Sequence, residues 1–167
     1  MARIFFCGDI VNQYSNVQFV GDSVKHIISR ADYAVCNLEG AVASGKEQNR
    51  GMLQQSSTLH SLKEAGFQLC LLANNHITDY GINSVIYTID LIRNLGMSSV
   101  GAGVGADSVY KPLIVIIGGQ KIGFISVCEA QLGQFDSAEC KYGYAWIGWP
   151  NLEKIISATR KAIDFLF

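Results

Sequence analysis

The order of apolar and polar positions predicts alternating strands and helices over the first 100 residues. Short apolar runs that end at glycine or polar residues predict buried strands. They lie at residues 3–7, 33–36, 67–73 and 97–100. Between these runs, apolar residues recur at the spacing of one helical face. The predicted helices are residues 22–31, 58–65 and 79–95. This alternation is typical of a largely parallel sheet with helices packed on it.

Capping residues support these helix boundaries. Ser57 or Thr58 can cap the second helix, which Gly66 ends, and Thr78 or Asp79 can open the third. Side-chain oxygens of such residues accept hydrogen bonds from the first free amides of a helix, and glycine readily takes the left-handed conformation at its end.

The pattern changes after residue 105. Residues 113–117 and 122–127 are apolar runs joined by a glycine-containing turn, which predicts a β-hairpin. Residues 43–55 and 129–149 show little periodicity and are predicted to be loops. Pro150 opens a predicted helix whose apolar face continues to Leu166. No clear helix is expected after the glycine-rich run at residues 101–105.

Composition excludes several classes of protein. With 49% hydrophobic and 16% charged residues, the chain is not intrinsically disordered. A net charge of −1 argues against a nucleic-acid or anionic-membrane partner held by bulk charge. No apolar run approaches the roughly 20 residues of a membrane helix, and no signal peptide is visible. We therefore expect a cytoplasmic location for the chain as given.

The cysteines indicate reduced thiols rather than a metal knuckle or disulfides. Their number, five, is odd, and none form a CxxC pair. The positions are Cys7, Cys36, Cys70, Cys128 and Cys140. Three of them lie in apolar, strand-like segments, where a free cysteine behaves as a small hydrophobic residue.

Polar side chains that can bind metal ions follow three successive predicted strands. Ligands bind beyond the carboxyl ends of the strands in open α/β sheets, so these residues should meet at one edge. They are Asp9 after the first strand, Asn37 and Glu39 after the second, and Asn74, Asn75, His76 and Asp79 after the third. Carboxylate, amide and imidazole groups together predict a site for one or two divalent metal ions.

Each of these residues also has a structural explanation. Asp9 can stabilise a turn, Glu39 can be a solvated loop acid, and Asp79 can be a helix cap. Turn chemistry does not require all of them at one sheet edge, so we favour the functional interpretation. Lys46 and Arg50, in the polar loop, are candidates to contact an anionic substrate, although solvated charges are the alternative.

The order of these motifs resembles the CapA family of bacterial capsule poly-γ-glutamate synthesis proteins. The matching motifs are GD at residues 8–9, NLEG at 37–40, NNHITDYG at 74–81, GAG at 101–103 and KIGFIS at 121–126. The resemblance covers nearly the whole chain and implies a metallophosphoesterase-like layered α/β sandwich. NNHITDYG together with NLEG is the specific part of the signature.

The resemblance also implies roles for single residues. Asp9 corresponds to the first acidic metal ligand, Glu39 to the carboxylate that bridges two metals, and Asn75 to the amide ligand. His76 corresponds to the histidine that contacts substrate or donates a proton, with Asp79 orienting it.

Two further residues and one departure complete the expected site. Asn37 and Asn74 are expected substrate contacts. Phosphoesterases commonly carry a histidine two residues after the first aspartate, where this sequence has Val11. The later histidine motifs of the family lie on strands beyond Phe167. We therefore expect the chain to be the first part of a longer family domain, truncated on its C-terminal side, with an incomplete metal site.

Two functions are consistent with this pattern. The first is a metal-dependent hydrolase of capsule polyglutamate biosynthesis, in which Mn, Fe or Zn activates water and His76 acts as the acid. Its substrate would be an anionic polymer or a phosphoester. The alternative is a non-catalytic polymer-binding or assembly module. Exposed sheet edges would favour a homo-oligomer, and the resemblance also allows a membrane-associated or exported protein.

Overall fold

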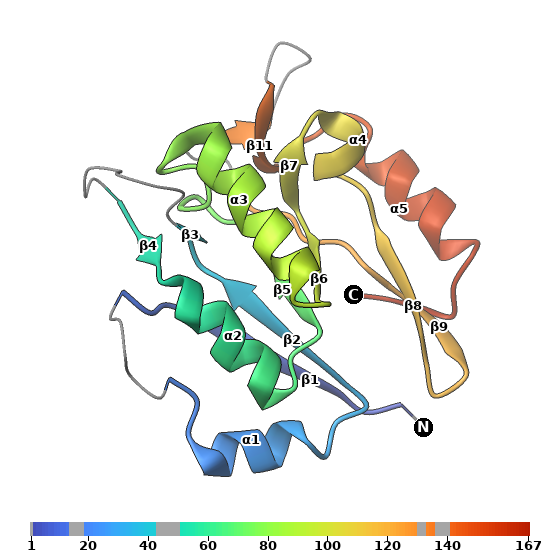
Figure 1. Ribbon diagram of the computed structural model, residues 1–167. Coiled ribbons are helices and arrows are strands. Elements are labelled where there is room, and N and C mark those ends of the chain that lie inside the picture. The colour runs from blue at the N-terminus through green and yellow to red at the C-terminus, as the bar shows by residue number, and fades with distance from the viewer. Residues whose placement is uncertain (1, 14–18, 43–50, 130–132, 136–140) are drawn as a thin grey trace.

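The computed structural model describes residues 2–13, 19–42, 51–129, 133–135 and 141–167 (Figure 1). Its central sheet has four strands in the order β1-β2-β5-β6, and every neighbouring pair is parallel. The strands are β1 (Ile4–Ile10), β2 (Tyr33–Leu38), β5 (Leu69–Leu71) and β6 (Ser98–Val100). The predicted alternation of strands and helices is therefore confirmed.

Three helices cover one face of the central sheet. They are α1 (Asp22–Ile28), α2 (Ser56–Ala65) and α3 (Gly81–Asn94). Their apolar sides pack on Cys36 and Cys70 of β2 and β5, which are fully buried. Gly66 ends α2 in the left-handed conformation (φ 100°), as predicted.

The predicted caps were wrong. The residue before α2 is Gln55 and the residue before α3 is Tyr80, and neither makes a capping side-chain hydrogen bond. Thr58 lies inside α2, and Asp79 precedes the N-cap of α3. Asp79 is therefore not explained by capping.

A second sheet covers the opposite face of the central sheet. Its order is β12-β9-β8, with β8 (Leu113–Ile117), β9 (Gln120–Phe124) and β12 (Phe165–Leu166). Ile122 and Phe124 pack against Val35 and Leu69 of the central sheet in one apolar cluster. The predicted hairpin is confirmed by the antiparallel pairing of β8 and β9.

The last helix is shorter than predicted. α5 (Leu152–Arg160) ends before the final residues, which pair with β9 as the parallel strand β12. The Asp164 carboxylate accepts a hydrogen bond from the Lys121 amide (2.8 Å), and Phe167 stacks on Phe124. These contacts with β9 are non-local, so the helical pattern of the sequence could not reveal them.

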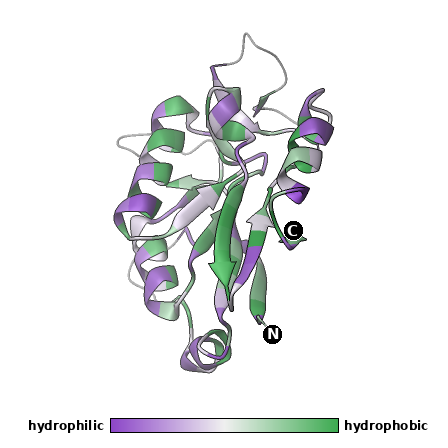
Figure 2. Cartoon of the chain, turned by 90° about the vertical axis from the view of Figure 1, so that its right-hand side faces the viewer, coloured by the Kyte–Doolittle hydropathy of each residue, from purple (hydrophilic) through white to green (hydrophobic). Residues whose placement is uncertain are grey.

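The elements form a layered α/β sandwich, as predicted, consistent with a metallophosphoesterase-like fold. Residues of α5 and of the turn after it lie over β9, since a Cβ at Gly123 would be 3.4 Å from Thr159 and 2.7 Å from Ile163. Figure 2 shows helices on both sides of the largely hydrophobic strands.

Short elements replace the two predicted loops in part. β4 (Leu53–Gln54), β10 (Gln134–Phe135) and β11 (Tyr142–Ala145) lie within these two ranges. Two further short strands, β3 (Ala41–Val42) and β7 (Ala102–Val104), lie outside them. Helix α4 (Ala106–Val109) follows the glycine-rich run, where none was expected. Tyr144 and Phe135 are buried, so residues 129–149 are not a surface loop throughout. Strands of two to four residues are too short to show a period in the sequence.

Apolar side chains lie exposed where β1 and β12 leave the two sheets open. Phe6, Phe165 and Phe167 are about half exposed (47%, 49% and 51%) and line a groove of about 300 Å³. Edge strands with exposed apolar residues favour association. Self-association through these edges stays a prediction. In the described part of the chain, no helix has the length and apolar character needed to span a membrane.

Candidate functional site

The side-chain amide of Asn37 joins the carboxylates of Asp9 and Glu39. Asn37 donates hydrogen bonds through Nδ2 to Asp9 Oδ1 and to Glu39 Oε2, both at 2.7 Å. Asp9 and Asn37 are register partners in β1 and β2. Both lie inside their strands rather than after them, which corrects the predicted strand ends. An irregularity in the pairing at Gly8 lets β1 continue through Asp9 to Ile10.

Glu39 lies in an environment that disfavours its charged form. Its residue exposure is only 9%. Burial raises the pKa of this carboxyl above its ordinary value, and the hydrogen bond from Asn37 partly opposes that shift. The negative charge of Asp9 raises the pKa further, whereas His76 lowers it. Burial, more than the neighbouring charges, therefore disfavours the ionised form of Glu39.

We expect Glu39→Gln to change how stability depends on pH. Because the folded-state pKa of Glu39 is raised, its protonated form stabilises the fold at low pH. That contribution is lost as the pH rises through the folded pKa. The Glu39→Gln variant should therefore gain stability relative to the unmodified protein as the pH rises above 4.5, the ordinary pKa of this carboxyl.

Urea unfolding at several pH values measures this effect, with Glu64→Gln on α2 as the matched control. The control should not reproduce the change in pH dependence, because Glu64 lies outside the site. A constant difference between the Glu39→Gln variant and the unmodified protein across pH would contradict the prediction.

Asn74 joins the ends of two strands. Its Oδ1 accepts a hydrogen bond from the Gly40 amide (3.1 Å), and its Nδ2 donates to the Leu38 carbonyl (2.9 Å) and more weakly to Asn37 (3.4 Å). The side chain is buried. This amide therefore fastens the segment after β5 to the segment after β2. Its role as a substrate contact stays a prediction.

His76 and Asp79 form a close pair after β5. His76 Nδ1 lies 2.8 Å from Asp79 Oδ2, and the same oxygen accepts a hydrogen bond from the Met52 amide (2.8 Å). The two side chains are 35% and 20% exposed, respectively. An ionised carboxylate only accepts hydrogen bonds, so His76 Nδ1 carries the hydrogen of this bond. Nε2 is then the nitrogen left to meet a ligand.

The site also contains a buried residue that the sequence pattern did not single out, Gln54. Its Nε2 donates to the carbonyls of Ile10 (2.7 Å) and Glu39 (2.6 Å), and its Oε1 accepts from the Asn12 amide (2.9 Å). The side chain is only 1% exposed. Gln54 therefore ties the backbone after β1 to the backbone after β2, next to both carboxylates. A glutamine in a polar stretch gives no sequence signal for such a role.

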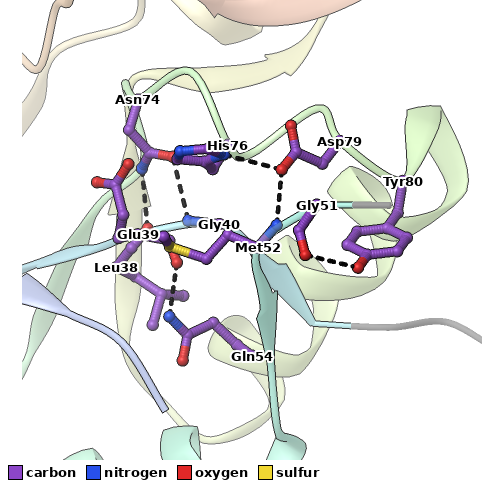
Figure 3. A network of polar contacts seen from close by, with 10 residues as sticks. All are labelled: Leu38, Glu39, Gly40, Gly51, Met52, Gln54, Asn74, His76, Asp79 and Tyr80. Atoms are coloured by element: carbon purple, nitrogen blue, oxygen red, sulfur yellow. Dashed lines mark hydrogen bonds and ion pairs between the residues drawn. The ribbon is translucent and has the colours of Figure 1, made fainter. Parts of the chain in front are cut away.

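The structure brings most of the predicted site residues together. Asp9, Asn37 and Glu39 are hydrogen-bonded, and Asn74 connects them to the segment that carries His76 and Asp79. Figure 3 shows Glu39, Asn74, His76 and Asp79 around one region.

The structure gives fewer contacts for the remaining predicted residues. Asn75 is half-buried, and no hydrogen bond joins its side chain to another described residue. Lys46 and Arg50 lie outside the described residues. Val11, at the position of the missing histidine, is 39% exposed.

The donor set agrees only in part with a metal centre. Within residues 2–13, 19–42, 51–129, 133–135 and 141–167, no group of three or more histidine, cysteine, aspartate or glutamate side chains is arranged to hold a metal ion. Two carboxylates, of Asp9 and Glu39, do lie around one amide. Carboxylate and amide oxygens suit hard divalent cations, so these two side chains could supply the acidic ligands, with Asn75 as a neutral one.

Comparison with known proteins gives relatives for nearly the whole chain. Residues 3–163 match the family described as "Bacterial capsule synthesis protein PGA_cap". The "Capsule biosynthesis protein CapA" of Bacillus anthracis is 28% identical over 129 residues, which cover 73% of this chain and 31% of that protein. This chain thus spans about a third of the length of that relative.

A solved structure has a similar fold. It is the crystal structure of a hypothetical protein from Thermus thermophilus, with a TM-score of 0.52 and 19% sequence identity. The similarity covers 97% of this chain and 54% of the other. At this identity the match supports the arrangement of strands and helices.

Proposed function

The chain belongs to the bacterial capsule synthesis protein family PGA_cap, and from this premise we propose that its site is a metal-dependent hydrolytic centre of capsule synthesis. We further propose that it acts on the γ-glutamyl polymer or on a phosphoester. The curated relative is named a capsule biosynthesis protein. That name and the residues at the sheet edge support the proposal.

One observation carries it. The His76–Asp79 pair, at 2.8 Å, shares a sheet edge with the Asp9 and Glu39 carboxylates, which one amide holds at 2.7 Å each. A structural role does not need an oriented imidazole beside two carboxylates gathered around one donor. A carboxyl group whose pKa is raised by burial, as that of Glu39 is, beside an oriented histidine is typical of functional sites.

The side chains have separate tasks in this proposal. Asp9 and Glu39 would hold a divalent ion such as Mn, Fe or Zn, with Asn75 as a further ligand. When bound, such an ion polarises the substrate and lowers the pKa of water. His76 would present Nε2 to the substrate and give a proton to the leaving group. Asp79 accepts the Nδ1 hydrogen and keeps the ring in that orientation.

Metal binding is the first test. Elemental analysis after incubation with Mn, Fe or Zn salts should find bound metal in the unmodified chain and none, or at most a tenth as much, in Asp9→Ala. Asp107→Ala, on α4 away from this site, is the matched control and should retain it. Equal metal in the unmodified chain and the Asp9 variant would overturn the proposed centre.

The alternative function, a non-catalytic binding or assembly module, predicts a different experimental result. A chain that binds no metal but retains γ-glutamyl polymer would be a binding or assembly module. Exposed Val11, where phosphoesterases carry a histidine, is the observation that favours this alternative. Polymer binding in metal-free buffer therefore distinguishes the two.

A further inference from the structure

We infer that Gly51 is a positioning residue of this site: because it has no side chain, the Asp79 carboxylate can approach and fix the tautomer of His76. The inference deepens the proposed function and rests on it for its catalytic meaning. The geometric part concerns only residues of this chain, so it can be tested without any activity.

Two hydrogen bonds join Gly51 and Met52 to the residues just before α3. The Met52 amide donates to Asp79 Oδ2 (2.8 Å), and the Gly51 carbonyl accepts a hydrogen bond from the Tyr80 hydroxyl (3.0 Å). Figure 3 shows both contacts and the His76–Asp79 bond beside them. Since the same Asp79 oxygen accepts from Met52 and pairs with His76, a shift of residues 51–52 that moves this oxygen alters both bonds.

The contact at Gly51 leaves no room for a side chain. A Cβ atom at this position would lie 2.6 Å from the Asp79 Cβ and would overlap the Asp79 carboxylate itself. Real Cβ contacts are not this short, so the aspartate or the backbone of residue 51 would have to move. The aspartate is the group that the Met52 amide and His76 need in place.

The backbone of residue 51 is not free to move away from Asp79, because the residues that follow it, 52–54, are held by other contacts. Gly40 has a left-handed φ of 86°, and a Cβ there would lie 2.7 Å from the Met52 carbonyl oxygen. β3 and β4 pair in parallel just beyond it, Ala41 with Leu53 and Val42 with Gln54. Gln54 then fastens this segment to Ile10 and Glu39. A methyl group at residue 51 should therefore displace Asp79.

Displacing Asp79 has a chemical consequence for His76. In a neutral imidazole one ring nitrogen carries the hydrogen, and the hydrogen-bond partners of the ring select which. With Asp79 in place, Nδ1 is the donor and Nε2 faces outward. Without that acceptor, the neutral ring is no longer held in this tautomer. Gly51 thereby determines which nitrogen of His76 meets a substrate.

The test is nitrogen NMR of the imidazole rings in the full, metal-free chain. In the unmodified protein the His76 signals should show predominantly Nδ1–H. In Gly51→Ala this tautomer should fall below half of the neutral form. The signals of His26 and His60 should not change, which shows that the fold is intact. Gly21→Ala is the matched control, because a methyl group there meets nothing within 4 Å.

Two more variants decide whether the effect passes through Asp79. Asp79→Ala alone should give the same His76 signature, and adding Gly51→Ala to it should cause no further change. Tyr80→Phe, which removes one attachment without adding atoms, should shift the signals in the same direction by less. If Gly51→Ala does not fold, Tyr80→Phe decides.

Unchanged His76 signals in the folded variants would overturn the inference. A tautomer shift in a chain that neither binds metal nor hydrolyses either substrate would overturn the proposed function alone. The inference about Gly51 would then stand as a structural finding.

Discussion

Replacing Gln54 by alanine should lower the free energy of unfolding by about 2–4 kcal/mol. The side chain is only 1% exposed and makes three hydrogen bonds, to Asn12, Ile10 and Glu39. Each such bond contributes about 0.5–1.5 kcal/mol net, and the cavity left by truncation adds to the loss. This is the largest stability effect we expect from a polar residue near the site.

Urea unfolding followed by circular dichroism measures that effect, and the next residue supplies its control. Gln55 is half-buried, and its side chain makes one hydrogen bond to a described residue, from Nε2 to the Gln13 carbonyl at 3.2 Å. Gln55→Ala should therefore cost less than about 1 kcal/mol. Gln54→Met keeps most of the volume and isolates the hydrogen bonds from the packing. A loss below about 1 kcal/mol in Gln54→Ala would show that these bonds do not hold the strand ends together.

Much of the site could be predicted because its residues follow the logic of a parallel sheet. The carboxyl ends of parallel strands lie at one edge, so chain order alone placed Asp9, Asn37 and Glu39 together. The hydrogen bonds of Asn37 confirm this placement. The metal, the substrate and the role of each side chain stay predictions.

The supporting residues could not be predicted for a physical reason. Gln54 and the Gly51–Met52 segment act through contacts with residues 15 to 44 positions away. They lie in a polar stretch without periodicity. Such a stretch has the same sequence pattern whether it forms an exposed loop or a buried segment held by long-range contacts. The strand β12 could not be predicted for the same reason. It pairs with β9, and Asp164, just before it, accepts a hydrogen bond from Lys121 of β9, 43 residues away. Local pattern fixes helix and strand, but not these long-range pairings.

His76→Gln should lower the rate of hydrolysis by roughly 10²–10⁴-fold if the proposed function is right. The replacement keeps a polar group but cannot transfer a proton, and Asp79 would lose its imidazole partner at 2.8 Å. The rate is measured on phosphoesters and on γ-glutamyl polymer with saturating Mn, Fe or Zn. The variant should retain most of the bound metal, because Asp9 and Glu39 are the proposed acidic ligands. Loss of rate without loss of metal would assign His76 to proton transfer rather than to holding the ion.

His60→Gln is the matched control for this prediction. His60 lies exposed on α2, where its Nδ1 approaches the Ser56 carbonyl at 3.1 Å, and it takes no part in the site. Its replacement should leave the rate within about twofold, because surface substitutions away from a site usually have small effects. Equal rates in the two histidine variants would exclude His76 as the proton donor. The bond between His76 and Asp79 would then serve only to hold the segment after β5 beside Met52, where Asp79 already accepts the backbone amide.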